Sequence, residues 1–443
     1  MNATSIQCLA LFAILGFMGA CPAQEQYLFK ESVQPGYQYH VSIRVRINGR
    51  LSVPVAPGKP TQLVDMTGDS ALEYDERILD DRAEQPAQSL RIYRQCDFNR
   101  TTGDRKQQST LRPEVRRLVL MRKDNVEVPF SPDGPLTWGE LDLIRTDVFT
   151  PALLSILPKR AVAVGDTWPI EKDAIRELTD LETIDEGTVE CTFDRLTTIG
   201  GRSLAHLRFR GKVRGVNEDG PNRQSLEGSV YFDLESRHLS YLYLDGVSEL
   251  LDKEGQPIGR IQGKFTLTRQ AGVRPVELSE KSIARLELTA NSSNTLLLYD
   301  DPELGVQFQY PRHWRVGTSR GTQITIDEAR GSGILLTIEP LDKTPTAERY
   351  LTESSEILKQ YKARILRTTQ PERLVGAPHE ITRFQVDVEL GDQTKALDYL
   401  VLRQTLAGAT IASQLLMTDR VNLGKDVLAI AKSIRLTRSP GGR

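Results

Sequence analysis

The chain has 443 residues, of which 39% are hydrophobic and 26% charged, and its formal net charge is −2. This length exceeds one ordinary domain and indicates two or three, while the composition is that of a folded rather than a disordered protein. This small net charge argues against a nucleic-acid partner and against general attraction to a membrane surface. A charged partner would therefore have to bind a local patch of charged residues.

The N-terminus carries a short apolar run at residues 8–18, "CLALFAILGFM", followed by the small residues of "GACPAQ". The run is too short to cross a bilayer, which takes about 20 residues, and is typical of a signal peptide over residues 1–23. Two outcomes stay open: cleavage after Ala23, or lipidation of Cys21 as in bacterial lipoproteins. Either predicts an exported protein that is periplasmic, lipid-anchored in the envelope, or secreted, with a lipid anchor as its only link to a membrane.

Residues 25–270 are expected to form a mainly-β region built on a large, curved antiparallel sheet. In "YQYHVSIRVRI" (residues 37–47), apolar residues alternate strictly with polar ones, which predicts a half-buried strand. Asn48-Gly49 then predicts a two-residue hairpin turn. The acidic stretch 69–84 favours a loop or a short helix.

A helical connector is expected at residues 136–159, where Thr150 and Pro151 suit the first positions of a helix. The connector leaves open whether the β region is one sheet or two subdomains. Cys96 and Cys191 remain after the signal segment, and two alternatives are open for them: a disulfide, which an exported protein permits, or two buried free thiols.

Residues 271–297 combine proline, charges and polar runs and are expected to link two domains. In residues 298–438, strands alternate with two amphipathic helices, one capped at Thr344 and one with apolar positions from Leu423 to Ile434. This order predicts an α+β domain in which helices pack on an antiparallel sheet.

The segment from Phe308 through Tyr310-Pro311 to Trp314, with the element order that follows it, resembles the Mog1/PsbP-like superfamily, which includes PsbP and exported proteins of the DcrB type. The resemblance implies a binding or assembly role rather than catalysis. It carries no metal-binding or partner-binding residues to this chain. The β region is similar to exported bacterial families of unknown function through Leu157-Pro158 and "VGDTW" at residues 164–168.

Motifs for catalysis and cofactors are missing from the sequence. The five histidines include no pair four residues apart, and no HExxH, CxxC, P-loop or GxGxxG motif occurs. We therefore expect no catalytic residues, no cofactor and no metal.

A basic strand is the one constellation that suggests a binding site. In "AHLRFRGKVRGV", cations alternate with apolar residues, which places them on one strand face; they are Arg208, Arg210, Lys212 and Arg214, with His206 before them. Two interpretations stay open: a face that binds an anion, or a solvated face neutralised by neighbouring acids.

The sequence therefore predicts an exported, non-catalytic binding or assembly module for another envelope protein or a ligand. The alternative is a carrier of a lipid or another hydrophobic ligand on the β domain, and an enzyme of unrecognised class is the third hypothesis.

Overall fold

The computed structural model describes residues 25–31, 33–54, 61–82, 85–123, 126–145, 147–391 and 393–438. The predicted signal peptide (residues 1–23) and its lipidation candidate Cys21 lie outside these residues. Within them, no helix combines the length and apolar character that crossing a membrane takes.

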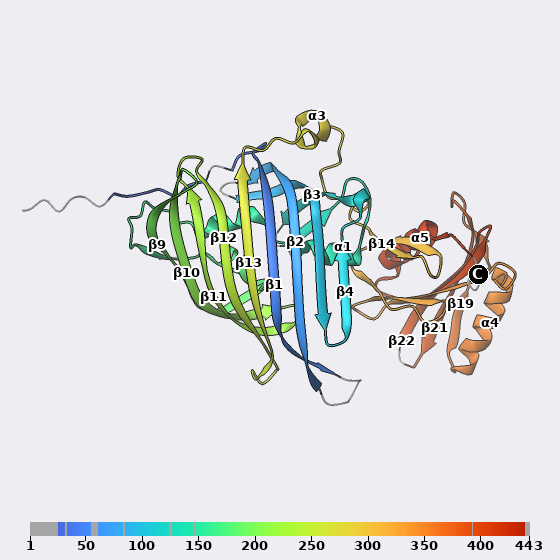
Figure 1. Cartoon of the computed structure of the whole chain (residues 1–443). Coiled ribbons are helices and arrows are strands. Elements are labelled where there is room, and N and C mark those ends of the chain that lie inside the picture. Colours follow the sequence, from blue (N-terminus) through green and yellow to red (C-terminus); the bar gives the residue numbers. More distant parts are fainter. Residues whose placement is uncertain are drawn as a thin grey trace, which may run out of the picture.

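The N-terminal region is dominated by one twelve-stranded sheet (Figure 1), which confirms the prediction of a large antiparallel sheet. Its order is β6-β5-β3-β2-β1-β13-β12-β11-β10-β9-β8, and β4 pairs with β3. The strands are β1 (Gln38–Pro54), β2 (Thr61–Arg82), β3 (Gln85–Thr102), β4 (Arg105–Thr110), β5 (Arg117–Lys123), β6 (Val126–Phe130), β8 (Thr167–Pro169), β9 (Thr183–Ile199), β10 (Arg202–Asn217), β11 (Gly220–Asp233), β12 (His238–Leu251) and β13 (Pro257–Ala271).

The predicted turn at Asn48-Gly49 is wrong, because β1 runs straight through it. Gly49 faces Met66 on β2 and Ile261 on β13. A Cβ at Gly49 would lie 2.2 Å from the carbonyl oxygen of Arg260, so glycine serves here for close approach of two strands rather than for a turn.

The acidic stretch 69–84 is also not a loop or a helix, since β2 covers nearly all of it. Leu72, Tyr74 and Ile78 enter the core, and the charged residues between them find partners on neighbouring elements. A charged stretch can be a strand when the fold supplies those partners.

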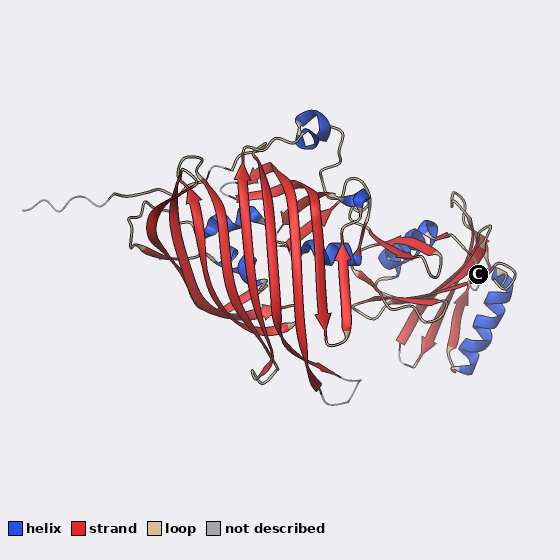
Figure 2. Cartoon of the chain, in the orientation of Figure 1, coloured by secondary structure: helices blue, strands red, loops and turns tan. Residues whose placement is uncertain are grey.

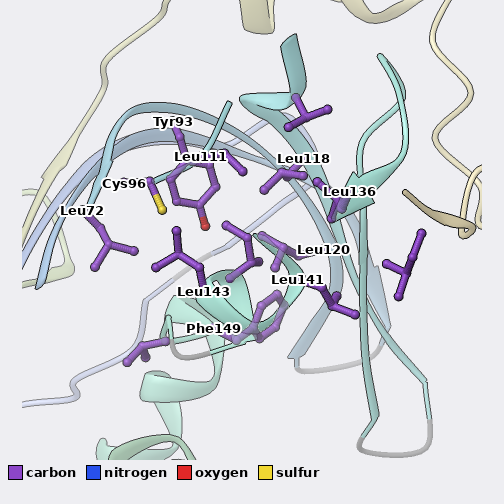
Figure 3. Packing of buried hydrophobic residues seen from close by; sticks show 14 of the residues in the cluster. Leu72, Tyr93, Cys96, Leu111, Leu118, Leu120, Leu136, Leu141, Leu143 and Phe149 are labelled. Carbon is purple, nitrogen blue, oxygen red and sulfur yellow. The ribbon is translucent and has the colours of Figure 1, made fainter. Parts of the chain in front are cut away.

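Residues 138–181, called the plug below, cover one face of the sheet (Figure 2) and leave it a single sheet rather than two subdomains. The plug contains α1 (Trp138–Arg145), the 3₁₀ helix η2 (Thr150–Ile156) and α2 (Lys172–Thr179), and between η2 and α2 the chain adds β8 to the edge of the sheet. Helical residues of α1 and η2 lie within the span 136–159, where the helical connector was predicted. Figure 3 shows side chains of β2, β3 and β5 converging with Leu141 and Leu143 of α1 and with Phe149.

Cys96 and Cys191 are buried free thiols, so the disulfide alternative is wrong. They lie on β3 and β9, which are separated in the sheet by six strands, and Cys96 packs among apolar side chains (Figure 3). Because strands lie about 4.8 Å apart, the thiols are far beyond disulfide distance.

Residues 297–438 form two further sheets with two long helices, as the α+β prediction expected. One sheet has the order β24-β15-β14-β7, and the other has the order β16-β17-β18-β23-β22-β21-β19, with β20 pairing β21. The strands are β7 (Leu136–Thr137), β14 (Leu297–Asp301), β15 (Val306–Tyr310), β16 (Trp314–Val316), β17 (Gln323–Glu328), β18 (Gly333–Pro340), β19 (Arg364–Thr368), β20 (Glu372–Arg373), β21 (Glu380–Leu390), β22 (Gln393–Arg403), β23 (Ala407–Leu416) and β24 (Arg435–Leu436).

The helices of this part differ in how well the sequence predicted them. In α5 (Arg420–Ser433), every predicted apolar position is buried. In α4 (Ala347–Gln360), the cap is Thr346, two residues after the predicted Thr344, and its hydroxyl accepts a hydrogen bond from the amide of Arg349. Ile357 in this helix and Tyr361 just after it are exposed, although the helix was predicted to be amphipathic.

The segment expected to be a linker packs on the outer face of the large sheet. It contains η3 (Val276–Leu278) and α3 (Glu280–Ile283), and Leu278 and Ile283 are buried against side chains of β3, β5 and β6. Arg77 of β2 donates to the carbonyl of Leu278 at 2.7 Å. The chain between the large sheet and β14 is therefore fixed along the sheet over part of its length.

Candidate functional site

The predicted basic face exists on the outer side of β10. Arg208, Arg210, Lys212 and Arg214 are all exposed, while the residues between them point inward. His206, the fifth member of the pattern, is buried and stacks on Tyr231, with ring centroids 4.7 Å apart.

Acidic residues on the neighbouring strands accompany these cations. Asp194 lies 3.8 Å from Arg208, and Glu186 lies 3.3 Å from Arg214. Arg210 stands between Glu190 of β9 and Glu227 of β11. This arrangement favours a solvated, internally neutralised face over an anion site, although anion binding there remains a prediction. Arg44 and Arg46 lie on β1, beyond three intervening strands, and do not join it.

A buried ionic cluster lies between the large sheet and the plug, and no sequence pattern predicted it. Arg91 on β3 donates through Nε to Glu76 of β2 at 2.9 Å and through Nη1 to Asp147 of the plug at 2.7 Å. All three side chains are 0% exposed. Thr150, the predicted helix cap, instead donates to Glu76 at 2.5 Å.

The two carboxylates of this cluster respond differently to their surroundings. Burial raises the pKa of Glu76, but Arg91 and the hydroxyls of Ser89 and Thr150 outweigh it and hold the pKa below its usual value. Burial dominates at Asp147 and raises its pKa despite Arg91. Perturbed carboxylates often mark active sites, but these have no exposed surface for a substrate, so the cluster anchors the plug.

A second buried ion pair anchors the N-terminal segment of the described chain. Glu31 pairs with Arg269 of β13 at 2.5 Å, and both side chains are 1% exposed. Phe29 packs edge-on against Phe193, with ring centroids 5.0 Å apart. Residues 27–31 therefore lie inside the curved sheet, beside the plug.

The plug does not cover the whole inner face of the sheet. The remainder is called the open section. It consists of the inner-facing positions toward the C-terminal ends of β1 and β12 and the N-terminal ends of β2 and β13. Its aliphatic side chains are half-buried and, among the described residues, belong to no hydrophobic core; they are Ile47, Leu51, Val64, Leu250 and Ile261.

Glycines let these side chains lie along the sheet. A Cβ at Gly259 would lie 2.9 Å from Leu51 and 3.5 Å from Leu250, and a Cβ at Gly68 would lie 2.9 Å from Ile47. The other inner positions of the open section are also uncharged: residues 45, 49, 66, 70, 246, 248, 263 and 265 are apolar, glycine or serine, and residue 62 is glutamine.

The outer face of the same four strands is charged. Arg50 pairs with Asp65 at 2.8 Å and Arg260 pairs with Glu249 at 2.8 Å. The strands thus alternate like those of a sheet whose inner face packs against apolar groups. In the open section, few side chains from the rest of the chain cover that inner face.

The segment around Trp314 joins the two halves of the molecule. Arg312 donates to the carbonyls of Thr295, at 2.8 Å, and of Pro129 on β6. Burial, with the nearby charge of Arg145, lowers the pKa of Arg312 to about 10. The guanidinium of Arg315 lies 3.9 Å from the ring centre of Trp138 on α1. β7 of the N-terminal region also pairs in parallel with β14.

Trp314 and His313 both contact α5. Trp314 is fully buried and donates to Asp426 of α5 at 3.2 Å. His313 is half-exposed and contacts the same carboxylate at 2.8 Å. Both residues thus fix α5 against β16, which is a structural role.

Metal ligation has no support in the described part of the chain, where no three His, Cys, Asp or Glu side chains gather closely enough to hold an ion. The protein belongs to the class of β-rich proteins that combine one large curved sheet with smaller sheets covered by helices.

No protein-family model matches the chain, and no curated protein matches it in sequence. Among solved structures, it is similar to cyanobacterial PsbP (CyanoP) from Synechocystis sp. PCC 6803, with 14% identity and a TM-score of 0.26, covering 32% of this chain and 92% of CyanoP. It is also similar to lipovitellin, with 8% identity and a TM-score of 0.30, covering 55% of this chain but only 26% of lipovitellin. The predicted likeness to PsbP is thus confirmed in part, over about a third of the chain, and these scores carry no inference about function.

Proposed function

We propose that this chain is an exported, non-catalytic binding protein whose ligand is hydrophobic and lies on the open section of the large sheet. The observation that carries this proposal is the pairing of an uncharged, half-buried inner face with a charged outer face on the same four strands. The fold leaves this apolar surface partly exposed. A hydrophobic ligand that covers it removes apolar surface from water, which stabilises the complex.

The occupant that fits this surface is a hydrocarbon chain, such as the acyl chain of a lipid. In the open section, the inner positions of β1, β2, β12 and β13 offer no charge, and their polar side chains are Gln62, Ser70 and Ser248. Four strands about 4.8 Å apart make a strip on the order of 15 Å wide, which suits an extended chain better than a bulky polar molecule.

The other parts of the proposal follow from the sequence. Export rests on the signal segment, and a lipid anchor at Cys21 would hold the sheet near a membrane, where such ligands are found. We assign residues 298–438 to a Mog1/PsbP-like module, on the strength of the motif around Trp314 and of an antiparallel sheet packed by α4 and α5. The buried state of the Arg91 cluster supports a role without catalysis.

The test uses two adjacent residues of β13 that point to opposite faces. Delipidated protein is titrated with a fluorescent fatty acid, and Ile261→Glu is expected to weaken binding at least tenfold, because it places a carboxylate under the hydrocarbon. Gln262→Glu adds the same charge on the outer face and should change affinity less than twofold. Thermal unfolding of both variants confirms that they fold.

Native mass spectrometry of protein purified from its host gives an independent readout. A bound lipid is the expected result. If the fatty acid does not bind, if both variants bind equally, or if a protein rather than a lipid accompanies the chain on this face, the proposal is wrong.

A further inference from the structure

We infer that the C-terminal module docks an acidic segment of a partner protein in two adjoining hollows on either side of His379. This site is separate from the open section and does not depend on the proposed hydrophobic ligand. One hollow, the Arg403 hollow, has a volume of about 480 Å³ and lies at the turn between β22 and β23. The other, the Arg435 hollow, has about 400 Å³ and lies between β15, the end of α5 and β24. His379 lines both.

Cations outnumber carboxylates in the lining of the two hollows taken together. Arg403 lines the first hollow, Lys432 and Arg435 line the second, and Glu380 is the only carboxylate among the lining residues of either. None of the three cations forms an ion pair with a carboxylate of the described chain. Lys432 and Arg435 thereby differ from the cations of β10, which stand beside acidic neighbours, whereas Arg403 faces Glu380 across the pairing of β21 with β22. Unpaired cations around a hollow attract an anionic group from outside.

The first hollow is held in place before any ligand arrives. Arg403 donates to the carbonyls of Thr344, at 2.9 Å, and Leu341, at 3.3 Å, which orient its guanidinium without neutralising it. The adjacent Gln404 donates to the carbonyl of Ile434 at 2.8 Å and accepts from the amide of Leu436 at 3.0 Å. A fixed guanidinium binds a carboxylate at a smaller entropic cost than a mobile one.

Apolar side chains beside the cations favour a polypeptide over a free small anion. Leu406 lines the Arg403 hollow and is 52% exposed, and Val375, in the segment that leads to Pro378 and His379, is 94% exposed. Single exposed apolar residues are ordinary on a protein surface. Here they flank a basic double hollow, which is the mixture of apolar anchors and charge that protein interfaces use.

Fluorescence anisotropy with a fluorescein-labelled hexaglutamate peptide tests the inference on the full chain. Lys432 and Arg435 are exposed, so the double variant Lys432→Glu/Arg435→Glu should fold normally and weaken peptide binding at least tenfold. The matched control Lys425→Glu/Arg285→Glu changes the net charge equally, away from the hollows, and should stay within twofold. Arg403→Gln should also weaken binding, and added salt should weaken binding to the parent chain.

Four results would overturn the inference: no binding by the parent chain, equal losses in both double variants, a loss only in Arg208→Glu/Arg210→Glu on β10, or full displacement of the peptide by inorganic phosphate at constant ionic strength. The last would assign the hollows to a small anion instead. Ile261→Glu should bind the peptide like the parent, so failure of the proposed hydrophobic site and failure of this docking site are distinguishable.

Discussion

The covered and open sections of the inner face occupy the same strands, yet they behave as different environments. On β1, Ile43 is 1% exposed beneath the plug, whereas Ile47, four residues later on the same face, is half-buried and outside the core. The strand has the same alternation at both places. What differs is the segment 138–181, which crosses one section and leaves the other. The difference teaches that the place where the plug ends sets how much of the apolar inner face stays uncovered.

The largest expected effect comes from breaking the anchor of the plug. Arg91→Leu leaves Glu76 and Asp147 buried without a counter-charge and should lower the free energy of unfolding by about 3–5 kcal/mol, as measured by urea denaturation. Arg94 lies three residues further along β3 and its side chain is half-exposed. Arg94→Leu should therefore lower the free energy of unfolding by less than about 1 kcal/mol. Equal losses in the two variants would show that the cluster does not hold the covered section.

A matched pair on β1 measures the two environments directly. Ile43→Ala removes core volume and should cost about 2–5 kcal/mol, whereas Ile47→Ala should cost about 1 kcal/mol or less, because solvent already reaches its side chain. Urea denaturation of both variants, without added lipid, gives the comparison. If the losses were the same, the open section would be part of the core and the division would fail.

A smaller effect depends on pH, at the edge of the covered section. Burial raises the pKa of Glu127 to about 7, against the attraction of Arg122. At pH values below 4.5 the carboxyl of Glu127 is mostly protonated in both the folded and the unfolded protein, so it does not change the free energy of unfolding. As the pH rises from 4.5 to 7, it ionises first in the unfolded chain, so stability falls and remains lower above pH 7.

Glu127→Gln should remove this loss and stabilise the protein by about 1–3 kcal/mol at pH 8, with little change at pH 4.5. The range is modest because the side chain retains 17% exposure. Urea denaturation at both pH values measures the effect, with the exposed Glu227→Gln as control. A pH dependence that survives in Glu127→Gln would assign it to another group.

Much of the fold follows from the sequence where a single strand or helix determines its own pattern. The alternation in residues 37–47 predicted β1 and its inward face, and the helical spacing from Leu423 to Ile434 predicted α5. The segment 69–84 was missed because its charged residues are buried by partners elsewhere. Glu76 bonds Arg91, fifteen residues away, and Thr150, seventy-four residues away, and no local pattern reveals either.

The candidate site was predictable to a lesser extent. The alternation along β1 and β13 already separates an uncharged face from a charged one, so the residues of the open section were present in the pattern. The pattern does not say which inward residues the plug reaches. Likewise, Arg403, Lys432 and Arg435 come from three elements, and only the tertiary fold gathers them around His379.

The pairing of β1 with β13 has a consequence for how this protein forms. Tyr39 faces Ala271, so the first long strand of the sheet and its last are central neighbours, and Glu31 meets Arg269 only after 238 further residues have been made. Contacts so distant in sequence make folding slow, and until they form both strands offer bare edges to other chains. A chaperone that holds the chain during this interval would therefore raise the yield of folded protein, and truncations before residue 271 should aggregate rather than fold.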